Sequence, residues 1–212
     1  MKNLISKVFL WMSLGLIVTF ATGYLITLNP RIINAIFGNL GYLGCIIFEI
    51  VLIFILSYRL FRMKPNTAKA TFLLYSFVNG LTFSSIFITY NLKSILLVFL
   101  ITAIIYGLLA LFWYKTKLNL EKPWPYLMFS LIGIIIVSII NLFLHNSKLE
   151  IIISIVSIII FMLITAYDVK KIKELSKNNL PQENLAIYGA LELYLDFINI
   201  FINLLRIKGN DD

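Results

Sequence analysis

The last apolar segment of the chain carries polar residues at the spacing of one helix face. They recur at intervals of 4, 3, 4 and 3 residues: Glu192, Asp196, Asn199, Asn203 and Arg206. The positions between them are almost all apolar or aromatic, so this helix would be hydrophobic on every side but one. Because carboxylates and amides are costly in hydrocarbon, this polar seam indicates either a functional pathway or a hydrogen-bonded contact between helices.

A second carboxylate, Asp168, ends the apolar segment before the seam, and a short turn joins the two segments. If the buried part of the last helix begins near Glu192, Asp196 lies only about 6 Å inside it and can meet Asp168. If burial begins at Leu185, Asp196 lies roughly 16 Å inside, too far for contact, and the two acids make separate surface contacts instead. The spacing of the residues along the sequence is consistent with both geometries.

If the two aspartates do pair, like charges in a poorly solvated site cannot easily both ionise, so they share one proton. This predicts a proton-operated switch with Asp168 and Asp196 as pH sensor and gate. Once both are ionised, the same oxygens are suitable metal ligands for a divalent cation, calcium above all. Calcium is then a transported or transiently bound ion, and no resident cofactor is expected.

Other charged and amide residues extend this hypothesis. Arg59 or Arg62, after the second apolar segment, can bridge to Asp168 as a latch that holds a closed state. Glu49 lies ten or thirteen residues earlier on the same helix, deeper in the apolar interior. An acid at that depth is a candidate step on an ion path. The expected path residues are Glu49, Glu192, Asn199 and Asn203.

The elements that must position these residues are membrane-spanning helices. Of 212 residues, 60% are hydrophobic and only 13% are charged, and the mean hydropathy is +0.94, which excludes an ordinary soluble domain. Seven segments approach the roughly 20 residues that cross a bilayer. They cover about 8–28, 33–58, 70–91, 94–114, 123–145, 151–168 and 187–207. We therefore expect an all-α polytopic protein with a single integral membrane domain over residues 1–212.

The positive charges cluster on alternate loops. One side would hold Lys2, Lys7, Arg59, Arg62, Lys64, Lys69, Lys115, Lys117, Lys122, Lys170, Lys171, Lys173 and Lys177, and the other only Arg31, Lys93 and Lys148. By the positive-inside rule, the N-terminus is cytoplasmic and, with seven spans, the C-terminus is outside, in a cell's inner (plasma) membrane. This distribution explains the formal net charge of +8 better than nucleic-acid binding, which is not expected.

The third span carries small and hydroxyl-bearing residues. They are Asn79, Gly80, Thr82, Ser84, Ser85 and Thr89. Such residues let two helix backbones approach closely and can hydrogen-bond across the contact, so this span is expected to pack tightly.

At these residues the chain resembles the Bax inhibitor-1 family of membrane proteins. The stretch Leu193-Tyr194-Leu195-Asp196-Phe197-Ile198-Asn199-Ile200-Phe201 is similar to the family's C-terminal signature, and Tyr167-Asp168 to its preceding acidic position. The third span, with Asn79-Gly80-Leu81-Thr82-Phe83, is similar to bacterial members. The resemblance implies a seven-helix bundle with the last helix in the centre and a pH-sensitive calcium leak. It also implies that Asp168 and Asp196 are the proton-sensing pair and places the latch on Arg62 or Arg59, of which Arg62 fits the downstream residues better.

Two rival functions belong to other classes. Intramembrane aspartyl proteases place Tyr-Asp on one helix, as in Tyr167-Asp168, but they carry Gly-x-Gly-Asp on the next, where this chain has Leu193, Tyr194 and Leu195 before Asp196. We therefore expect no enzyme. Some bacterial relatives are associated with control of a membrane-bound protease, so a regulatory protein that binds such a protease is the alternative. In that role, the Lys-rich segment after Asp168 and the N-terminus would be the docking surface.

Overall fold

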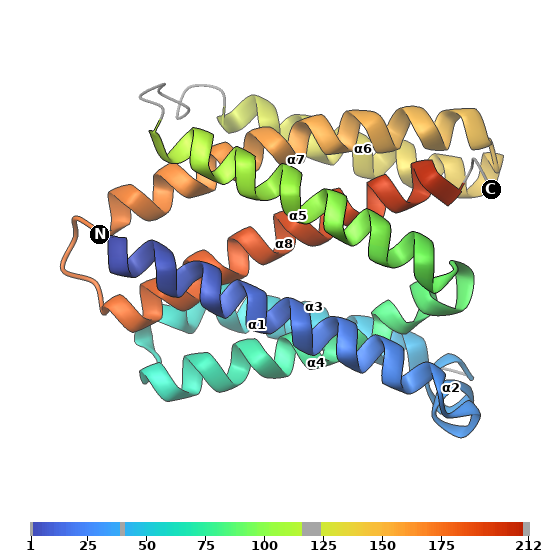
Figure 1. The fold of residues 1–212 in the computed structure, drawn as a ribbon, viewed down its shortest axis with the longest axis horizontal. Helices are drawn as coiled ribbons and strands as arrows, with labels where there is room; N and C mark the ends of the chain where they lie inside the picture. The colour runs from blue at the N-terminus through green and yellow to red at the C-terminus, as the bar shows by residue number, and fades with distance from the viewer. Residues whose placement is uncertain (1, 39–40, 116–123, 210–212) are drawn as a thin grey trace. The chain divides into compact units, whose positions relative to one another are not determined.

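A computed structural model describes residues 2–38, 41–115 and 124–209, and this part of the chain consists of helices joined by short turns, without a strand (Figure 1). The helices are α1 (Lys2–Thr27), α2 (Pro30–Phe37), α3 (Gly41–Arg59), α4 (Pro65–Thr89), α5 (Leu92–Lys115), α6 (Trp124–Leu144), α7 (Ser147–Leu175) and α8 (Gln182–Gly209), with a 3-10 turn, η1 (Leu60–Arg62), after α3. Seven helices are long and apolar enough to cross a membrane: α1, α3 with η1, and α4 to α8. The prediction of an all-α polytopic membrane protein is confirmed.

The structure differs from the expected boundaries at the second span. That span does not begin at 33, because a separate short helix, α2, precedes α3. Asn29 caps α2 by accepting a hydrogen bond from the Arg31 backbone N–H at 3.0 Å, Pro30 starts it, and Gly38 ends it. The membrane-spanning helix α3 then begins at Gly41.

The last two spans are longer than expected. Helix α7 continues past Asp168 to Leu175, so the Lys-rich segment is a helical extension, as the sequence predicts. Helix α8 begins at Gln182 rather than 187. The predicted loop cations Lys117 and Lys122, and the first residue of the span expected at 123, lie outside the described residues.

The chain forms two compact units. The first unit contains Met1–Asn91 and Lys173–Tyr194. In it α1 packs along α4, and α3 packs on the same helix (Figure 1). Helices α1 and α4 approach each other closely at Gly80, where a Cβ atom would lie 2.6 Å from Thr22 Cβ and 2.8 Å from the Thr19 carbonyl oxygen. The expected tight packing of the third span is therefore present.

The second unit contains Leu92–Ile172 and Leu195–Asp212. Its α6 and α7 pack through a cluster of Leu127, Ile160 and Ile164. Its α5 packs on the second half of α8 through aromatic rings, with ring centroids 5.3 Å apart for Phe99 and Phe197. Helix α8 thus contributes its first half to one unit and its second half to the other.

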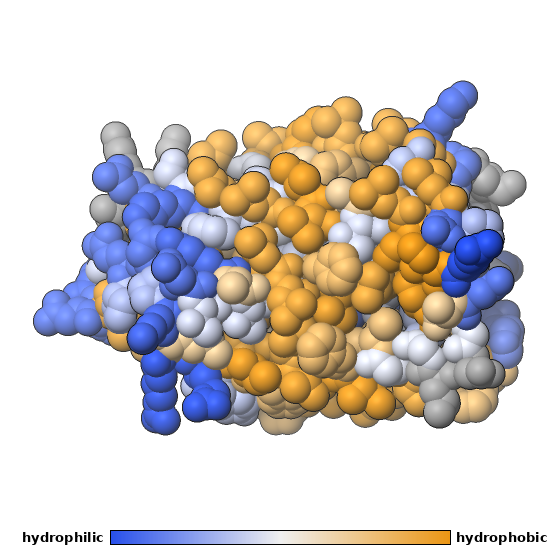
Figure 2. Space-filling view, turned by 90° about the horizontal axis from the view of Figure 1, so that it is seen from below, coloured by the Kyte–Doolittle hydropathy of each residue, from blue (hydrophilic) through white to orange (hydrophobic). Residues whose placement is uncertain are grey.

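Helix α8 is the most buried of the seven candidate spans. In its most apolar stretch 78% of the residues are buried, against 44% in α4 and α7. A helix that is polar along one face and buried on most sides needs protein around it, because lipid cannot satisfy its polar groups. On the face that Figure 2 shows, hydrophobic residues cover the middle and hydrophilic residues gather toward the ends, as expected for a surface that meets lipid.

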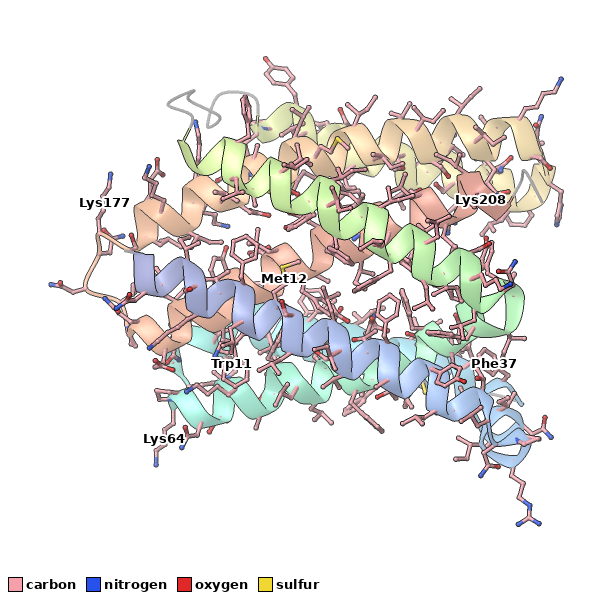
Figure 3. All side chains as sticks on the ribbon, in the orientation of Figure 1. Trp11, Met12, Phe37, Lys64, Lys177 and Lys208 are labelled. Carbon is pink, nitrogen blue, oxygen red and sulfur yellow. The ribbon has the colours of Figure 1, made fainter. Side chains whose placement is uncertain are left out.

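Within the first unit the predicted cytoplasmic residues lie at one end. Trp11, Lys64 and Lys177 lie toward the same end, and Phe37 of α2 lies toward the other (Figure 3). Near Lys64, Glu183 of α8 forms salt bridges with Lys7 of α1 and with Lys69 of α4, the latter at 2.7 Å. These pairs tie three helices together where the sequence predicts the cytoplasmic boundary.

Candidate functional site

Asp168 and Asp196 lie in the same unit and are both buried. Each residue is only 3% exposed. Neither acid is the last residue of its helix. Asp168 is seven residues before the end of α7, and Asp196 is in the middle of α8. Burial of two carboxylates is expensive unless they bind protons, cations or hydrogen-bond donors. That the two acids pair with each other stays a prediction.

A tyrosine from a third helix joins the two acids. The Tyr106 side chain of α5 is 2% exposed, and its hydroxyl is close enough to Asp196 and Asp168 to interact with the charge of both. This hydroxyl has no hydrogen bond of regular geometry within the described residues, and Thr165 of α7 is the side chain placed to hydrogen-bond with it. The dipole of a buried O–H that interacts with the charge of two carboxylates can stabilise whichever of them is ionised.

Neighbouring rings fix this tyrosine and the aspartates. The Tyr106 ring lies edge-on to Phe197, with centroids 5.7 Å apart, and Phe197 directly follows Asp196. On α7, the ring of Tyr167, directly before Asp168, stacks on Trp124 of α6 at a centroid distance of 3.8 Å. Each aspartate therefore neighbours an aromatic residue that is packed against another helix, which limits the movement of its backbone.

Replacing Tyr106 by Phe is expected to shift the pH response of this site without unfolding the protein. The Tyr106 O–H dipole favours the ionised acids, so its loss should move the half-maximal pH of a flux through the site upward, by up to about one pH unit, which corresponds to about 1.4 kcal/mol. The measurement is ion flux against pH in reconstituted vesicles. Tyr126→Phe is the matched control because Tyr126 is 75% exposed. If Tyr106→Phe left the half-maximal pH of the flux unchanged, Tyr106 would have no effect on the titration of Asp168 and Asp196.

The polar seam lies on one unbroken helix, as predicted. Asn199 Nδ2 donates to the Leu195 carbonyl and Asn203 Nδ2 to the Asn199 carbonyl, both at 2.8 Å, so each amide is anchored one turn back on its own helix. Asn203 Oδ1 is buried without a hydrogen-bond partner among the described residues. Glu192 and Arg206 are half-buried. The Asn203 amide oxygen is therefore available as an acceptor, whereas the amide nitrogens of Asn199 and Asn203 donate to the backbone of their own helix.

Both candidate latch residues are at the expected end of the second span and are exposed. Arg59 ends α3 and Arg62 ends η1. They belong to the first unit, whereas Asp168 belongs to the second, so the latch stays a prediction. The turn that carries Arg62 is held by Asn184 of α8. Its Nδ2 donates to the carbonyl oxygens of Leu60 at 2.6 Å and Met63 at 2.9 Å.

Asn184→Ala is expected to destabilise the first unit, because Asn184 is fully buried and two buried carbonyl oxygens would lose their donor. A buried polar group left unsatisfied costs about 1–3 kcal/mol, so we expect a loss of roughly 2–4 kcal/mol. Thermal unfolding in detergent measures the loss. Asn178→Ala is the control, since Asn178 is exposed in the turn between α7 and α8. Equal stability of the two variants would contradict a structural role for Asn184.

Glu49 lies in the first unit, apart from the aspartate-containing unit, and is half-buried. Its carboxylate accepts hydrogen bonds from three side chains of α4: Asn79, Thr82 at 3.0 Å and Tyr75 at 3.4 Å. The hydroxyl and amide groups of the third span, α4, thus hydrogen-bond to an acid on α3 in addition to allowing close helix packing.

Within the described residues, no three His, Cys, Asp or Glu side chains gather closely enough to hold a metal ion. The two aspartates remain the predicted ligand pair. Calcium takes six to eight oxygen ligands, so a calcium ion held by these two carboxylates would keep several waters. The donor set fits an ion that passes or binds briefly.

The fold and the buried acids define the class: a polytopic all-α membrane protein with two buried carboxylates in its second unit. The comparisons with known proteins give the family. The family model for the inhibitor of apoptosis-promoting Bax1 matches residues 1–212. The chain therefore belongs to the Bax inhibitor-1 family, as its motifs indicate.

Similar proteins come from several bacteria. The chain is 35% identical to the inner membrane protein YbhL of Escherichia coli, covering 99% of this chain and 92% of that protein. It is 39% identical to an uncharacterized protein of Borreliella burgdorferi, over 98% and 92%. An uncharacterized membrane protein of Streptococcus pyogenes is 35% identical over 81% of this chain and 75% of its own length.

Tyr106, Asn184 and Tyr194 are candidate site residues that sequence reasoning did not single out as such. Tyr106 had a detectable signal, because it is a hydroxyl in the middle of a span without charged residues. Asn184 and Tyr194 had none, because an amide near a turn and an aromatic residue in an apolar helix are ordinary at such positions. Their roles depend on partners more than 100 residues away in sequence.

Proposed function

We propose that this protein is a pH-sensitive calcium leak channel of the inner (plasma) membrane, gated by protonation of Asp168 and Asp196. The observation that carries the proposal is the burial of both aspartates in one unit, where the Tyr106 hydroxyl interacts with the charge of each. A shared proton keeps the pair close to neutral, and its loss creates two anionic oxygen ligands inside the membrane protein. The leak should therefore increase as pH rises.

The ion path proposed here uses acceptors placed along α8. Asn203 Oδ1, buried and without a described donor, is one such acceptor, and Glu192 is half-buried on the same helix face, with Asn199 between them. Carbonyl and carboxylate oxygens are the ligands that calcium prefers. Arg62 or Arg59 is proposed to close the path by pairing with Asp168, which would neutralise the carboxylate in the resting state.

The orientation proposed is a cytoplasmic N-terminus and an external C-terminus. Its support is the positive-inside distribution of the loops, together with Lys64 and Lys177 at the same end of the first unit (Figure 3). The printed name of YbhL as an inner membrane protein supports the same membrane for this chain.

The test is calcium flux into dye-loaded liposomes that contain the purified protein. We expect the leak rate to rise with pH through the titration of the pair and to exceed that of empty liposomes. No flux above empty liposomes at any pH would overturn the channel function.

The alternative is a regulatory protein that binds a membrane-bound protease. The observation in its favour is that α7 continues as a rigid helix past Asp168, carrying Lys170, Lys171 and Lys173 where a partner could bind. Co-purification with such a protease, retained when both aspartates are neutralised, would support this role. It does not exclude ion leakage.

A further inference from the structure

A second polar network lies in the first unit, around the acid that the sequence predicts as a step on the ion path. It starts at Glu49 on α3, whose carboxylate accepts from Asn79 Nδ2 on α4. Asn79 Oδ1 is 2.7 Å from the Tyr194 hydroxyl on α8. That hydroxyl is 2.6 Å from Thr19 Oγ1 on α1, and Thr19 Oγ1 is 2.9 Å from the Ser76 carbonyl oxygen. The chain of contacts joins four helices.

All the inner members of this network are buried. Thr19, Ser76 and Tyr194 are fully buried, and Asn79 is 7% exposed. Glu49 itself is eight residues after the start of α3 and ten before its end, about 12 Å and 15 Å along the helix. The network therefore crosses the first unit in the middle of the membrane-spanning region, where bulk water does not compete for hydrogen bonds.

The number of protons in the network does not match the number of contacts when Glu49 is ionised. The last three contacts, from Asn79 Oδ1 to Ser76 O, each have hydrogen-bond length, but the two hydroxyls of Tyr194 and Thr19 supply only two protons. Asn79 Oδ1 and the Ser76 carbonyl oxygen can only accept. One contact is therefore left without a hydrogen, and two buried oxygens in close contact without one repel each other.

One added proton completes the chain. When Glu49 is a neutral acid, its O–H can donate to Asn79 Oδ1 once the Asn79 amide rotates by half a turn. Asn79 Nδ2 then donates to Tyr194, Tyr194 to Thr19, and Thr19 to Ser76 O. Every contact has one donor and one acceptor, and fully satisfied chains of this kind are mutually reinforcing.

We propose that Glu49 is a second proton-binding site of this protein, and that its protonation reverses the hydrogen bonds from Asn79 through Tyr194 to Thr19. The ligand is a proton. The site is separate from the aspartate pair, because it lies in the other unit and shares no residue with it. The inference goes beyond the proposed channel and does not depend on calcium.

Within the described residues, titratable groups from three helices interact with Glu49. They are the Tyr75 hydroxyl on α4, the Tyr194 hydroxyl on α8 and the Cys45 thiol one turn earlier on α3. Tyr75 and Thr82 donate to the ionised carboxylate, together with Asn79 Nδ2. Donors thus stabilise the ionised form and the completed chain stabilises the neutral form, so both states have hydrogen-bond support.

The test is infrared difference spectroscopy of the full-length protein in lipid, recorded without calcium during acidification. We expect a carbonyl stretch from a protonated carboxyl group that is lost in Glu49→Gln and retained in the Asp168→Asn, Asp196→Asn double variant. In wild-type protein, ¹³C-labelled glutamate should shift this band and ¹³C-labelled aspartate should not, which identifies the residue type even if Glu49→Gln folds poorly.

Tyr194→Phe tests the chain itself. Without the phenol oxygen, the rotated Asn79 amide has no acceptor, so the Glu49 band should move in frequency. Tyr126→Phe, at an exposed position on α6, should leave it in place. The proposal would be overturned if glutamate labelling shifted none of the titrating acid bands, or if every such band of the wild type persisted in Glu49→Gln. A Tyr194→Phe variant that loses thermal stability while the band keeps its frequency would reduce Tyr194 to a packing role and overturn the chain. The calcium-flux test of the channel function is independent of this test, because the spectra are recorded without calcium. Either proposal can therefore fail while the other holds.

Discussion

Replacing both Asp168 and Asp196 by Asn is expected to remove the pH dependence of calcium leak through this protein. One proton changes a two-state population by at most about tenfold per pH unit, since one pH unit corresponds to about 1.4 kcal/mol per proton. The wild-type leak should therefore rise up to about tenfold per pH unit across the titration of the pair. Asn has nearly the shape of Asp but cannot ionise, so the double variant should leak at one constant level.

The single variants make the test sharper. Either Asp168→Asn or Asp196→Asn leaves one carboxylate without its like-charged neighbour, so each should flatten the pH profile. Glu174→Gln is the control, because Glu174 is an exposed acid on the same helix as Asp168. Liposome flux over a range of pH is the measurement, with thermal unfolding in detergent to show that the variants are folded. A double variant that retains the wild-type profile would show that the pair is not the sensor.

Gly80→Ala is expected to destabilise the protein although it adds only one methyl group. The added methyl would lie 2.6 Å from Thr22 Cβ and 2.8 Å from the Thr19 carbonyl oxygen. Backbone cannot rotate away as a flexible side chain can, so α1 must move off α4. Overpacking of this kind costs about 1–3 kcal/mol, and Gly80→Leu should cost more.

The matched control is Gly133→Ala in α6, where a Cβ atom would meet nothing within 4 Å. Since Ala favours a helix over Gly by up to about 1 kcal/mol in water, this variant should be as stable as the wild type or slightly more stable. Thermal unfolding in detergent compares the two. If Gly80→Ala matched Gly133→Ala, the close approach of α1 to α4 would not contribute to stability.

Much of the fold was predictable because hydrocarbon imposes a simple rule. A backbone in lipid must satisfy its own hydrogen bonds, so a long apolar run becomes a helix, and its hydropathy is sufficient to locate it. The start of the second span was predicted wrongly because that prediction also relied on hydropathy alone. Residues 30–37 are apolar enough to join the following helix, but Pro30 and Gly38 set local boundaries that average hydropathy does not detect.

The candidate site was predictable only where residue type alone was unusual. Asp168, Asp196 and Glu49 stand out because acids are rare in apolar segments. Tyr106 and Asn184 do not stand out, because their chemistry depends on which groups the fold brings to them.

The sequence by itself determined the class of this protein, its membrane-spanning helices and its family motifs, because these follow from composition, helical spacing and short-range pattern. Only the tertiary structure decided that Asp168 and Asp196 face one tyrosine and that Glu49 begins a chain of contacts through Asn79, Tyr194 and Thr19. The physical reason is that helical periodicity tells which residues share a face, whereas packing between helices decides what that face meets.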